Sequence, residues 1–243
     1  MTLLQLSGVN RRFGGVVAVN DVDFEVEAGE IVGLMGANGA GKTTLFSMIA
    51  GNLRPSSGQI MLNDRRIDRL RPDQICRLGV ARAFQIVRPF AGLTVVENVA
   101  IGELFGSRRE YSLTRAENAA RETLDEVGLG DRADDPAGTL TLAGRKRLEI
   151  ARALATHPRL LLLDEVMAGL TPVEVAEALD TIRLLHQRYD LTIIVIEHVM
   201  RALMRLSDRL IVLHHGAKIA EGSPDEIAND ASVIEAYLGD RAR

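Results

Sequence analysis

Apolar residues at alternate positions open the chain and predict β-strands. Three segments show this alternation: Leu4–Gly8, Val17–Val19 and Val22–Val26. A period of two is typical of strands with one buried face. The stretch Ile31–Met35 is apolar throughout and runs into a glycine-rich segment, which predicts a buried strand leading into a loop. Beyond that loop, residues 45–49 keep helical spacing, and Gly51 is expected to end this helix.

Helical periods replace this alternation between about Pro89 and Thr156. Three helices are predicted there: Val95–Leu104, Arg115–Val127 and Arg145–Ala155. Strands and helices alternate again from Leu160. This part is predicted to contain strands at Leu160–Leu163 and Thr192–Ile196, helices at Pro172–Arg188 and Met200–Leu206, and a hairpin of Leu210–Leu213 with Ala217–Ala220 around Gly216. The pattern favours an α/β nucleotide-binding core that an all-helical insertion interrupts.

Composition and charge agree with this fold class and exclude several others. Of the 243 residues, 47% are hydrophobic and 26% are charged, so the chain can bury a core. The net charge of -4 excludes a basic surface for general nucleic-acid binding. A single cysteine, Cys76, excludes zinc clusters and disulfide frameworks and suits a reducing cytoplasm. We expect no secretory signal in Met1–Gly8, and no apolar run approaches the ~18 residues of a membrane span.

A phosphate-binding loop is the clearest motif. The pattern of Gly, four residues and Gly-Lys-Thr is met by Gly36, Ala37, Asn38, Gly39, Ala40, Gly41, Lys42 and Thr43. Glycines let backbone N–H groups converge on phosphate oxygens, and the following helix directs its positive end at them. Lys42 would neutralise the β- and γ-phosphates, and the Thr43 hydroxyl would bind Mg²⁺. The alternative is an ordinary glycine-rich turn, but Lys42 is one of only 3 lysines beside 26 arginines.

Two carboxylates follow a second apolar strand. Asp164 lies at the carboxyl end of Leu160–Leu163, where Mg²⁺ and its waters need an anionic partner. Glu165 is placed to polarise the water that attacks a γ-phosphate. A strand that ends in a solvated acidic turn would have the same local pattern. The phosphate loop in the same chain favours a nucleotide site.

Other motifs narrow the class of phosphate-loop protein. Small GTPases need Asn-Lys-x-Asp to read guanine, and none of Lys42, Lys146 and Lys218 lies in such a motif. Simple kinases have their acidic strand much closer to the phosphate loop than Asp164 is to Lys42. The helical insertion instead ends in Leu140–Leu154, where the chain resembles the ATP-binding subunits of ABC transporters. Their signature loop, Leu-Ser-Gly-Gly-Gln, opens a helix that ends in a similar Ala-Arg-Ala-Leu run shortly before the acidic strand.

This resemblance covers nearly the whole chain and implies roles for further residues. Phe13 resembles the aromatic residue that stacks on adenine, although a core aromatic is the alternative. Gln85 is similar to the Q-loop glutamine, which binds Mg²⁺ and senses the membrane partner. Met167–Leu170 looks like the D-loop, and His198 like the switch histidine that contacts the γ-phosphate. Thr44 joins the nucleotide-binding residues by its place after Gly-Lys-Thr. None of the other histidines has a spacing that suggests a metal site.

The signature loop departs from the family pattern. Aligned without a gap, Leu-Ser-x-Gly-Gln falls on Leu140, Thr141, Leu142, Ala143 and Gly144. Thr141 keeps a hydroxyl for the γ-phosphate, and the N–H groups at the start of a helix remain available. Ala143 adds a methyl group where a glycine normally lets the backbone approach the nucleotide. We expect the ATP site that this loop completes to close more weakly, unless the backbone tolerates alanine there.

The end of the chain resembles one branch of the family. Residues 214–224 and 233–239 are similar to the tail of importers for branched-chain and other hydrophobic amino acids, and Ala81–Gln85 and Leu148–Arg152 agree. Urea and short-amide importers carry similar subunits, as do lipopolysaccharide exporters, so these substrates remain alternatives. A non-transport ABC ATPase and a binding module without turnover are further alternatives. Against them, the chain has no sustained heptads, room for only one ATP module, and both Glu165 and His198.

The resemblance implies an architecture and a pair of cofactors. The expected fold class is α/β, a P-loop NTPase core of the ABC ATPase type with an N-terminal antiparallel β subdomain and an inserted helical subdomain. Residues 1–243 would form a single ATP-binding domain, with the nucleotide-binding core in 1–88 and 157–243 and the helical signature subdomain in about 89–156. The cofactors are ATP and Mg²⁺, with Thr43, Gln85 and Asp164 as the expected metal ligands.

The resemblance also implies partners. These are integral membrane permease subunits, a second ATP-binding subunit in a head-to-tail homodimer or heterodimer, and indirectly a periplasmic binding protein, with no nucleic acid. The chain would lie peripherally on the cytoplasmic face of the inner membrane, and ATP binding and hydrolysis would close and reopen the dimer. The surface that couples to the permease is expected at Ile86–Phe90, where apolar residues that include Val87 and Pro89 follow Gln85.

Overall fold

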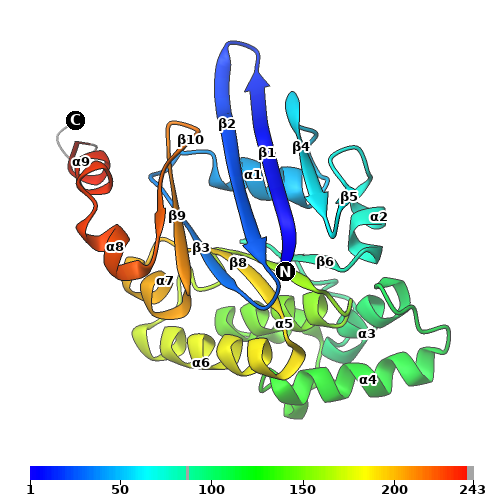
Figure 1. Cartoon of the computed structure of the whole chain (residues 1–243). Coiled ribbons are helices and arrows are strands. Elements are labelled where there is room, and N and C mark those ends of the chain that lie inside the picture. Colours follow the sequence, from blue (N-terminus) through cyan, green and yellow to red (C-terminus); the bar gives the residue numbers. More distant parts are fainter. Residues whose placement is uncertain (86–87, 240–243) are drawn as a thin grey trace. The chain divides into compact units, whose positions relative to one another are not determined.

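The computed structural model describes residues 1–85 and 88–239, with side chains as far as residue 236 (Figure 1). The chain divides into two compact units. The first contains Met1–Pro72 and Thr192–Arg243, and the second contains Asp73–Leu191. Each unit has its own strands and helices, and the residues predicted to bind nucleotide are distributed over both.

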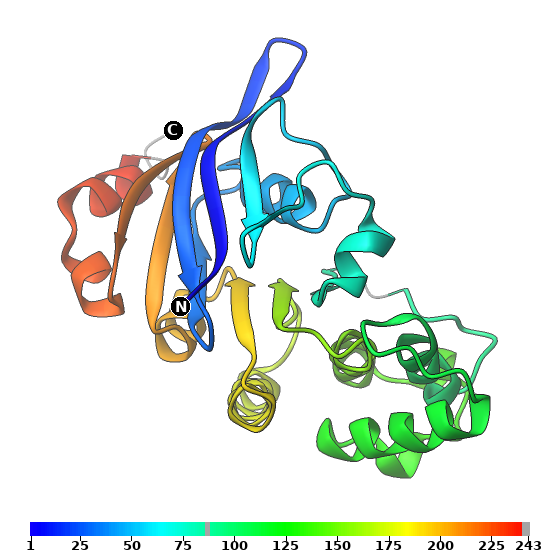
Figure 2. The same ribbon diagram turned by 45° about the vertical axis from the view of Figure 1, so that its right-hand side comes forward.

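An antiparallel sheet in the order β2-β1-β4-β5 begins the first unit. Its strands are β1 (Thr2–Phe13), β2 (Val16–Glu27), β4 (Ser57–Leu62) and β5 (Arg65–Arg66). Figures 1 and 2 show β1 running between β2 and β4. The two segments predicted at Val17–Val19 and Val22–Val26 are one strand, β2. Their alternation changes phase because Asp21 has a φ of 50° and the pairing with β1 shifts register there. This β-bulge keeps both Val19 and Val22 buried.

Strands predicted from the sequence form the core of the first unit. β3 (Ile31–Met35) pairs in parallel with β8 (Thr192–Ile196) and with β9 (Arg209–His214). β10 (Ala217–Gly222) is antiparallel to β9 and closes the hairpin predicted around Gly216. Every residue of β3 and β8 is buried, as parallel strands covered on both faces require. The structure confirms these strands.

Short helices complete the first unit: α1 (Lys42–Ile49), α7 (Met200–Leu206), α8 (Pro224–Asn229) and α9 (Ala231–Gly239). α1 starts directly after the glycine-rich loop and ends just before Gly51, which has a φ of 76°. α7 has the predicted bounds. α8 begins with a capping box in which the Ser223 hydroxyl and the Glu226 carboxylate each accept from the other's backbone N–H.

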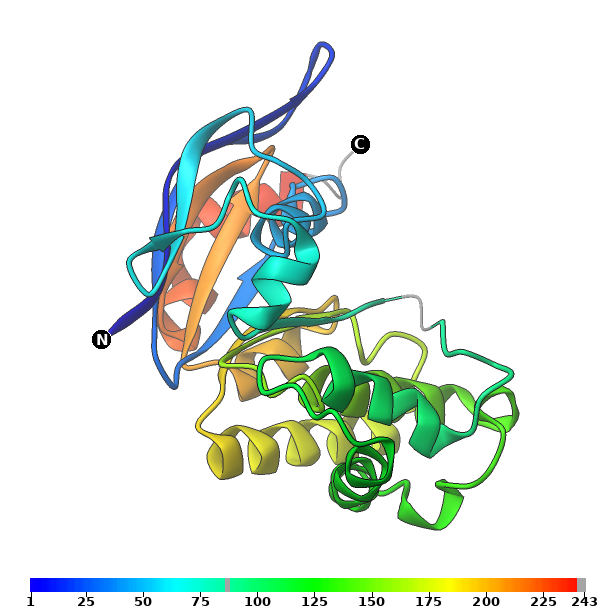
Figure 3. The ribbon, with the colours of Figure 1, turned by 90° about the vertical axis from the view of Figure 1, so that its right-hand side faces the viewer.

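The second unit joins two parallel strands to a mostly helical chain (Figure 3). Its strands are β6 (Val80–Ala83) and β7 (Leu160–Asp164). Its helices are α2 (Pro72–Arg77), which begins at the boundary, α3 (Val95–Phe105), α4 (Leu113–Glu126), α5 (Leu142–Leu154) and α6 (Pro172–Tyr189), with 3₁₀ turns at Gly130–Arg132 and Ala137–Thr139. α3 to α6 confirm the predicted helices within a few residues. β6 and α2 escape prediction because each is too short to show a clear period.

No helix in the described part of the chain combines the length and the apolar character that crossing a membrane requires. Within the same residues, no group of His, Cys, Asp and Glu side chains gathers into a metal cluster. Of the histidines without a predicted role, His157 contacts Glu103 at 2.8 Å. The rings of His214 and His215 stack edge to face with centroids 4.1 Å apart.

Candidate nucleotide-binding site

The glycine-rich loop of the first unit connects β3 to α1 and has a backbone that only glycine accommodates well. Gly36 and Gly41 have φ values of 150° and 100°. A Cβ atom at Gly36 would lie 2.4 Å from the carbonyl oxygen of Leu213, and one at Gly41 would lie 2.4 Å from that of Ala18. Both positions therefore combine a left-handed backbone with a close approach of another strand's backbone.

Lys42 starts α1 and turns back over the loop. Its ammonium donates to the carbonyl oxygens of Gly36 at 2.6 Å and Ala37 at 3.0 Å, and the residue is 6% exposed. α1 has no side-chain cap at Gly41 and no acidic residue in its first turn. Its first N–H groups and its positive end are thus available to an anion. Thr43 is exposed in this first turn, beside the half-buried Thr44.

A support for this loop comes from the turn between β9 and β10, which sequence reasoning did not connect with it. The N–H of Gly216 donates to the carbonyl oxygen of Ala40 at 3.2 Å, and the Gly216 carbonyl accepts from Asn20 at 2.8 Å. The β9–β10 turn therefore joins the phosphate loop to β2 through backbone hydrogen bonds. No local pattern in residues 36–43 could have indicated this partner.

Two other predicted residues of the first unit lie at surfaces. Phe13 ends β1 with 45% of its surface exposed, and the Arg11 guanidinium lies 4.5 Å from its ring centre. The ring is thus no core aromatic, and its face is of the kind that can stack on a base. His198 is exposed two residues after β8. The adenine and γ-phosphate roles of these residues remain predictions.

In the second unit, Asp164 ends β7 and is almost fully buried. Its Oδ2 accepts from Arg82 on the neighbouring strand β6 at 2.5 Å. Its Oδ1 is buried and has no hydrogen-bond partner among the described residues. An orphaned carboxylate oxygen at the end of a strand is chemically suited to accept the water shell of Mg²⁺. Arg82 was not anticipated, because its position on β6 says nothing about which carboxylate it meets.

Glu165 follows Asp164 with an unusual backbone. Its φ is 52°, in the left-handed region that non-glycine residues rarely occupy. Its carboxylate accepts a hydrogen bond from the amide nitrogen of Gln85. The structure therefore brings together Gln85, Asp164 and Glu165 within the second unit, while the phosphate loop, Phe13 and His198 belong to the first.

The Lys146 side chain of α5 is a further positively charged group near Glu165 that the sequence did not predict. The Nζ atom of Lys146 donates to the carbonyl oxygens of Gln85 at 2.7 Å and of Glu165 at 3.1 Å. One turn further, burial raises the pKa of the Glu149 carboxyl, and Arg152, at 2.9 Å, opposes this shift. The rarity of lysine was the available signal, since Lys146 is one of 3 in the chain.

The predicted signature loop starts α5. Thr141 is the N-cap, and its hydroxyl oxygen accepts from the N–H of Gly144 at 3.2 Å. Leu142 is half exposed and Leu140 is buried. Ala143 lies in the first turn of the helix and its φ is not positive, so the backbone at this position does not require glycine. The remaining difference from the family pattern at position 143 is the methyl group.

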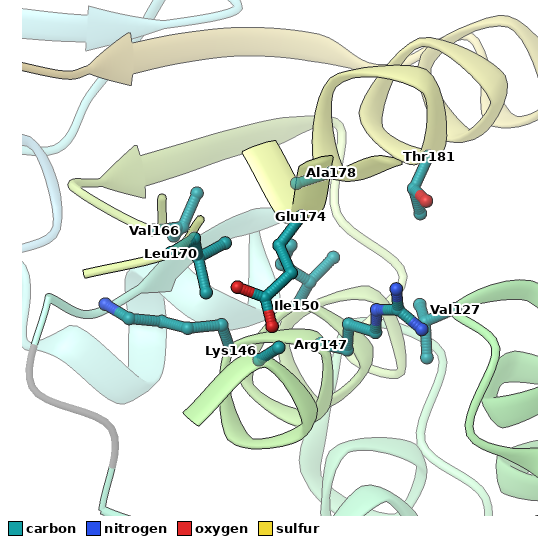
Figure 4. Close-up of a pocket in the computed structure, with 10 residues that line it drawn as sticks. Val127, Lys146, Arg147, Ile150, Val166, Leu170, Glu174, Ala178 and Thr181 are labelled. Atoms are coloured by element: carbon teal, nitrogen blue, oxygen red, sulfur yellow. The ribbon is translucent and has the colours of Figure 1, made fainter. Parts of the chain in front are cut away.

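A small, mostly apolar pocket lies between α5 and α6 (Figure 4). It is lined by Val127, Ala143, Lys146, Arg147, Ile150, Val166, Leu170, Glu174, Ala178 and Thr181. The predicted D-loop borders the same region, because a Cβ atom at Gly169 would lie 3.0 Å from Cδ2 of Leu142. The signature helix and the D-loop are thus direct neighbours within the second unit.

The predicted coupling surface is described only in part, since Ile86 and Val87 lie outside the described residues. Pro89 is half-buried rather than exposed, and Phe90 is 49% exposed. Asn98 of α3 holds the Phe90 backbone by accepting from its N–H at 2.8 Å and donating to its carbonyl at 3.1 Å. The Arg152 guanidinium lies 5.2 Å from the Phe90 ring centre.

Comparison with known proteins identifies relatives that span the whole chain. LivG of Escherichia coli K12, described as a high-affinity branched-chain amino acid transport ATP-binding protein, is 41% identical over 98% of each chain. LptB of Acidithiobacillus ferridurans, described as a lipopolysaccharide export system ATP-binding protein, is 36% identical over 98% of each chain. A solved ADP conformation of an ATP-binding cassette of an ABC transporter has a TM-score of 0.88 and 28% identity, covering 98% of this chain and 99% of its own.

Two family models match the sequence. One, described as branched-chain amino acid ATP-binding cassette transporter, matches residues 217–243. The other, described as ABC transporter, matches residues 19–168, which include the phosphate loop, the signature loop and both carboxylates. Together with the full-length relatives and the cassette fold, this match shows that the chain belongs to the ABC transporter family and carries its ATPase domain.

Proposed function

We propose that this chain hydrolyses ATP to power an importer of branched-chain or other hydrophobic amino acids. The observation that carries the proposal is the phosphate loop, in which Lys42 covers its own loop carbonyls and α1 begins without a side-chain cap. Relatives with the name LivG and the matched C-terminal segment support the choice of transported substrate.

The residues of both units have distinct roles in this proposal. Lys42 and the N–H groups of the loop bind the phosphates, and Phe13 stacks on the adenine. Glu165 orients and polarises the attacking water, and His198 holds the γ-phosphate. Mg²⁺, when bound by Thr43, Gln85 and Asp164, neutralises charge on the phosphates. The buried, unpartnered Oδ1 of Asp164 supports that ligand set.

The proposal extends to assembly and position. The chain would pair head to tail with a second ATP-binding subunit, so that residues 140–144 of one copy cap the phosphate loop of the other. It would lie on the cytoplasmic face of the inner membrane, bound to permease subunits through the surface around Phe90. A periplasmic binding protein would deliver the substrate.

Two variants of the chain test the ATPase proposal. Lys42→Ala should abolish ATP binding without unfolding the protein, because the loop backbone does not need a lysine to form. The loss of the two hydrogen bonds to the Gly36 and Ala37 carbonyls should lower the melting temperature only modestly. Glu165→Gln should keep ATP bound and lose turnover by orders of magnitude, because an amide cannot polarise water. Calorimetry measures the affinity for ATP, thermal melting gives the melting temperature, and phosphate release gives the turnover rate. Unchanged ATP affinity in Lys42→Ala, or normal turnover in Glu165→Gln, would contradict the assigned roles.

Lipopolysaccharide export is the second candidate, favoured by the 36% identity to LptB. Urea and short amides are further candidate substrates. Transport assays in vesicles that contain the chain with its permeases separate these possibilities. Uptake of radiolabelled leucine or isoleucine that depends on ATP supports the proposal, whereas uptake of urea alone or export of a lipid contradicts it.

A further inference from the structure

One face of α5 binds the backbone of the chain that leaves β6. Lys146, Glu149 and Arg152 are spaced three residues apart, so they lie along one side of the helix. Lys146 donates to the carbonyl oxygen of Gln85 at 2.7 Å, and the Glu149 carboxylate accepts from the N–H of Phe84. The helix that begins with the signature loop thus holds the backbone on both sides of the Phe84–Gln85 peptide.

Lys146 also reaches a second segment. Its Nζ atom lies 3.1 Å from the carbonyl oxygen of Glu165, and the residue is only 5% exposed. One buried ammonium group therefore binds the backbone carbonyl groups of both Gln85 and Glu165. The side chains of these two residues also contact each other, because the Gln85 amide donates to the Glu165 carboxylate. Hydrogen bonds from a charged donor are stronger than neutral ones, especially away from water.

The conformation of Glu165 needs such support. A φ of 52° is unfavourable for a residue with a Cβ atom, and it persists only where the surroundings hold it. If the backbone relaxed to a right-handed conformation, the carboxylate would point in another direction. The contact from Lys146 acts on this peptide, because its acceptor is the carbonyl oxygen of Glu165 itself.

We propose that Lys146 is a positioning residue that holds Glu165 in its hydrolytic orientation and links that orientation to Gln85 and to the signature helix. The inference rests on the proposed role of Glu165. Lys146 does not touch the substrate in this scheme. It acts through the two carbonyl groups, so a displacement of the Gln85 backbone or of α5 changes how firmly Glu165 is held.

Three substitutions test this role. Lys146→Met keeps most of the unbranched side chain and removes the donor, and Lys146→Arg restores a charged donor. Arg147→Met is the matched control, because Arg147 leaves α5 in the opposite direction (Figure 4) and pairs with Glu177 at 2.6 Å. In Lys146→Met we expect kcat to fall about tenfold or more, since the buried charged hydrogen bonds to Gln85 and Glu165 are lost, with the Kd for ATP within about twofold. Lys146→Arg should be closer to the wild type than Lys146→Met.

Hydrogen exchange provides a readout that does not depend on turnover. Backbone amides in peptides containing Phe84–Gln85 and Glu165–Met167 should exchange faster in Lys146→Met than in Arg147→Met at equal melting temperature. Unchanged exchange and kcat would overturn the inference. So would a parallel loss of ATP affinity, melting temperature and kcat, which indicates a merely structural role. Glu165→Gln is measured beside them: if that variant keeps normal turnover, the proposed role of Glu165 fails, whereas an inactive Glu165→Gln with a normal Lys146→Met removes only this inference.

Discussion

Two glycines of the phosphate loop share a left-handed backbone but have different surroundings. Gly39 has a φ of 83° and Gly41 a φ of 100°. Nothing within 4 Å would meet a Cβ atom at Gly39, whereas one at Gly41 would lie 2.4 Å from the carbonyl oxygen of Ala18. The pair therefore separates the cost of backbone conformation from the cost of a collision with β2.

Alanine at each glycine should have a different effect. In Gly39→Ala the left-handed conformation is the only source of destabilisation, so the free energy of unfolding should fall by roughly 1–2 kcal/mol. Gly41→Ala must also displace β2 or the start of α1, so we expect a larger loss of stability together with weaker ATP binding. Urea denaturation and calorimetry measure these effects, and equal losses in the two variants would mean that the contact with Ala18 does not matter.

At the scale of elements, the ends of α4 and α6 are joined by a small polar cluster. The hydroxyl of Tyr189 donates to Glu126 at 2.6 Å, and Arg188 pairs with the same carboxylate at 3.0 Å. Partial burial, together with the hydrogen bond and charge of Glu126, raises the pKa of Tyr189 to about 12. The two helices are far apart in sequence, so this contact stabilises the fold of the second unit.

The raised pKa predicts a pH dependence of stability. An unfolded tyrosine releases its proton near pH 10, but the folded one keeps it to about pH 12. The contribution of Tyr189 is therefore complete below pH 10 and is lost as the pH rises from about 10 to 12. The difference in unfolding free energy between wild type and Tyr189→Phe should shrink over this range. Tyr111→Phe, at a ring that is 84% exposed, is the control variant.

For the whole molecule, the altered signature loop concerns the pairing of two ATP-binding subunits in a dimer. A composite ATP site takes its phosphate loop from one subunit and its signature loop from the other. In a homodimer of this chain, both sites would be capped by residues 140–144. Because the backbone at Ala143 is helical, any weakening comes from its methyl group, from Thr141 in place of serine, or from the missing side chain at Gly144.

We predict that ATP-dependent dimerisation of the isolated chain is weak and that a regular signature strengthens it. The triple variant Thr141→Ser, Ala143→Gly, Gly144→Gln should dimerise more tightly with ATP and turn over faster. The single variant Ala143→Gly isolates the effect of the methyl group. Light scattering with the inactive Glu165→Gln background measures dimerisation. Equal dimerisation and equal turnover in wild type and triple variant would show that both sites are equally competent.

Local residue patterns were enough to predict the strands β3, β7 and β8, the helices α1 and α3 to α7, and the phosphate loop. β3, β7 and β8 are continuous apolar runs with glycine or a carboxylate at their ends, so both their burial and their bounds are local properties. The family resemblance added the residues expected to contact the nucleotide. The match of residues 19–168 confirms the family, and the roles of these residues stay predictions. The strand β6 could not be predicted, because it is too short to show a period. The continuity of β2 could not be predicted either, because its bulge interrupts the alternation that indicates a strand.

Which groups meet depends on how the elements pack in three dimensions. Three contacts join distant parts of the chain. Arg82 binds Asp164, and the β9–β10 turn binds the carbonyl group of Ala40. Lys146 binds the carbonyl groups of Gln85 and Glu165. A hydrophobic period specifies which face of an element is buried, but it contains no information on where a backbone carbonyl group points. Carbonyl directions depend on φ and ψ in loops such as the one at Glu165, and packing of the assembled unit selects them.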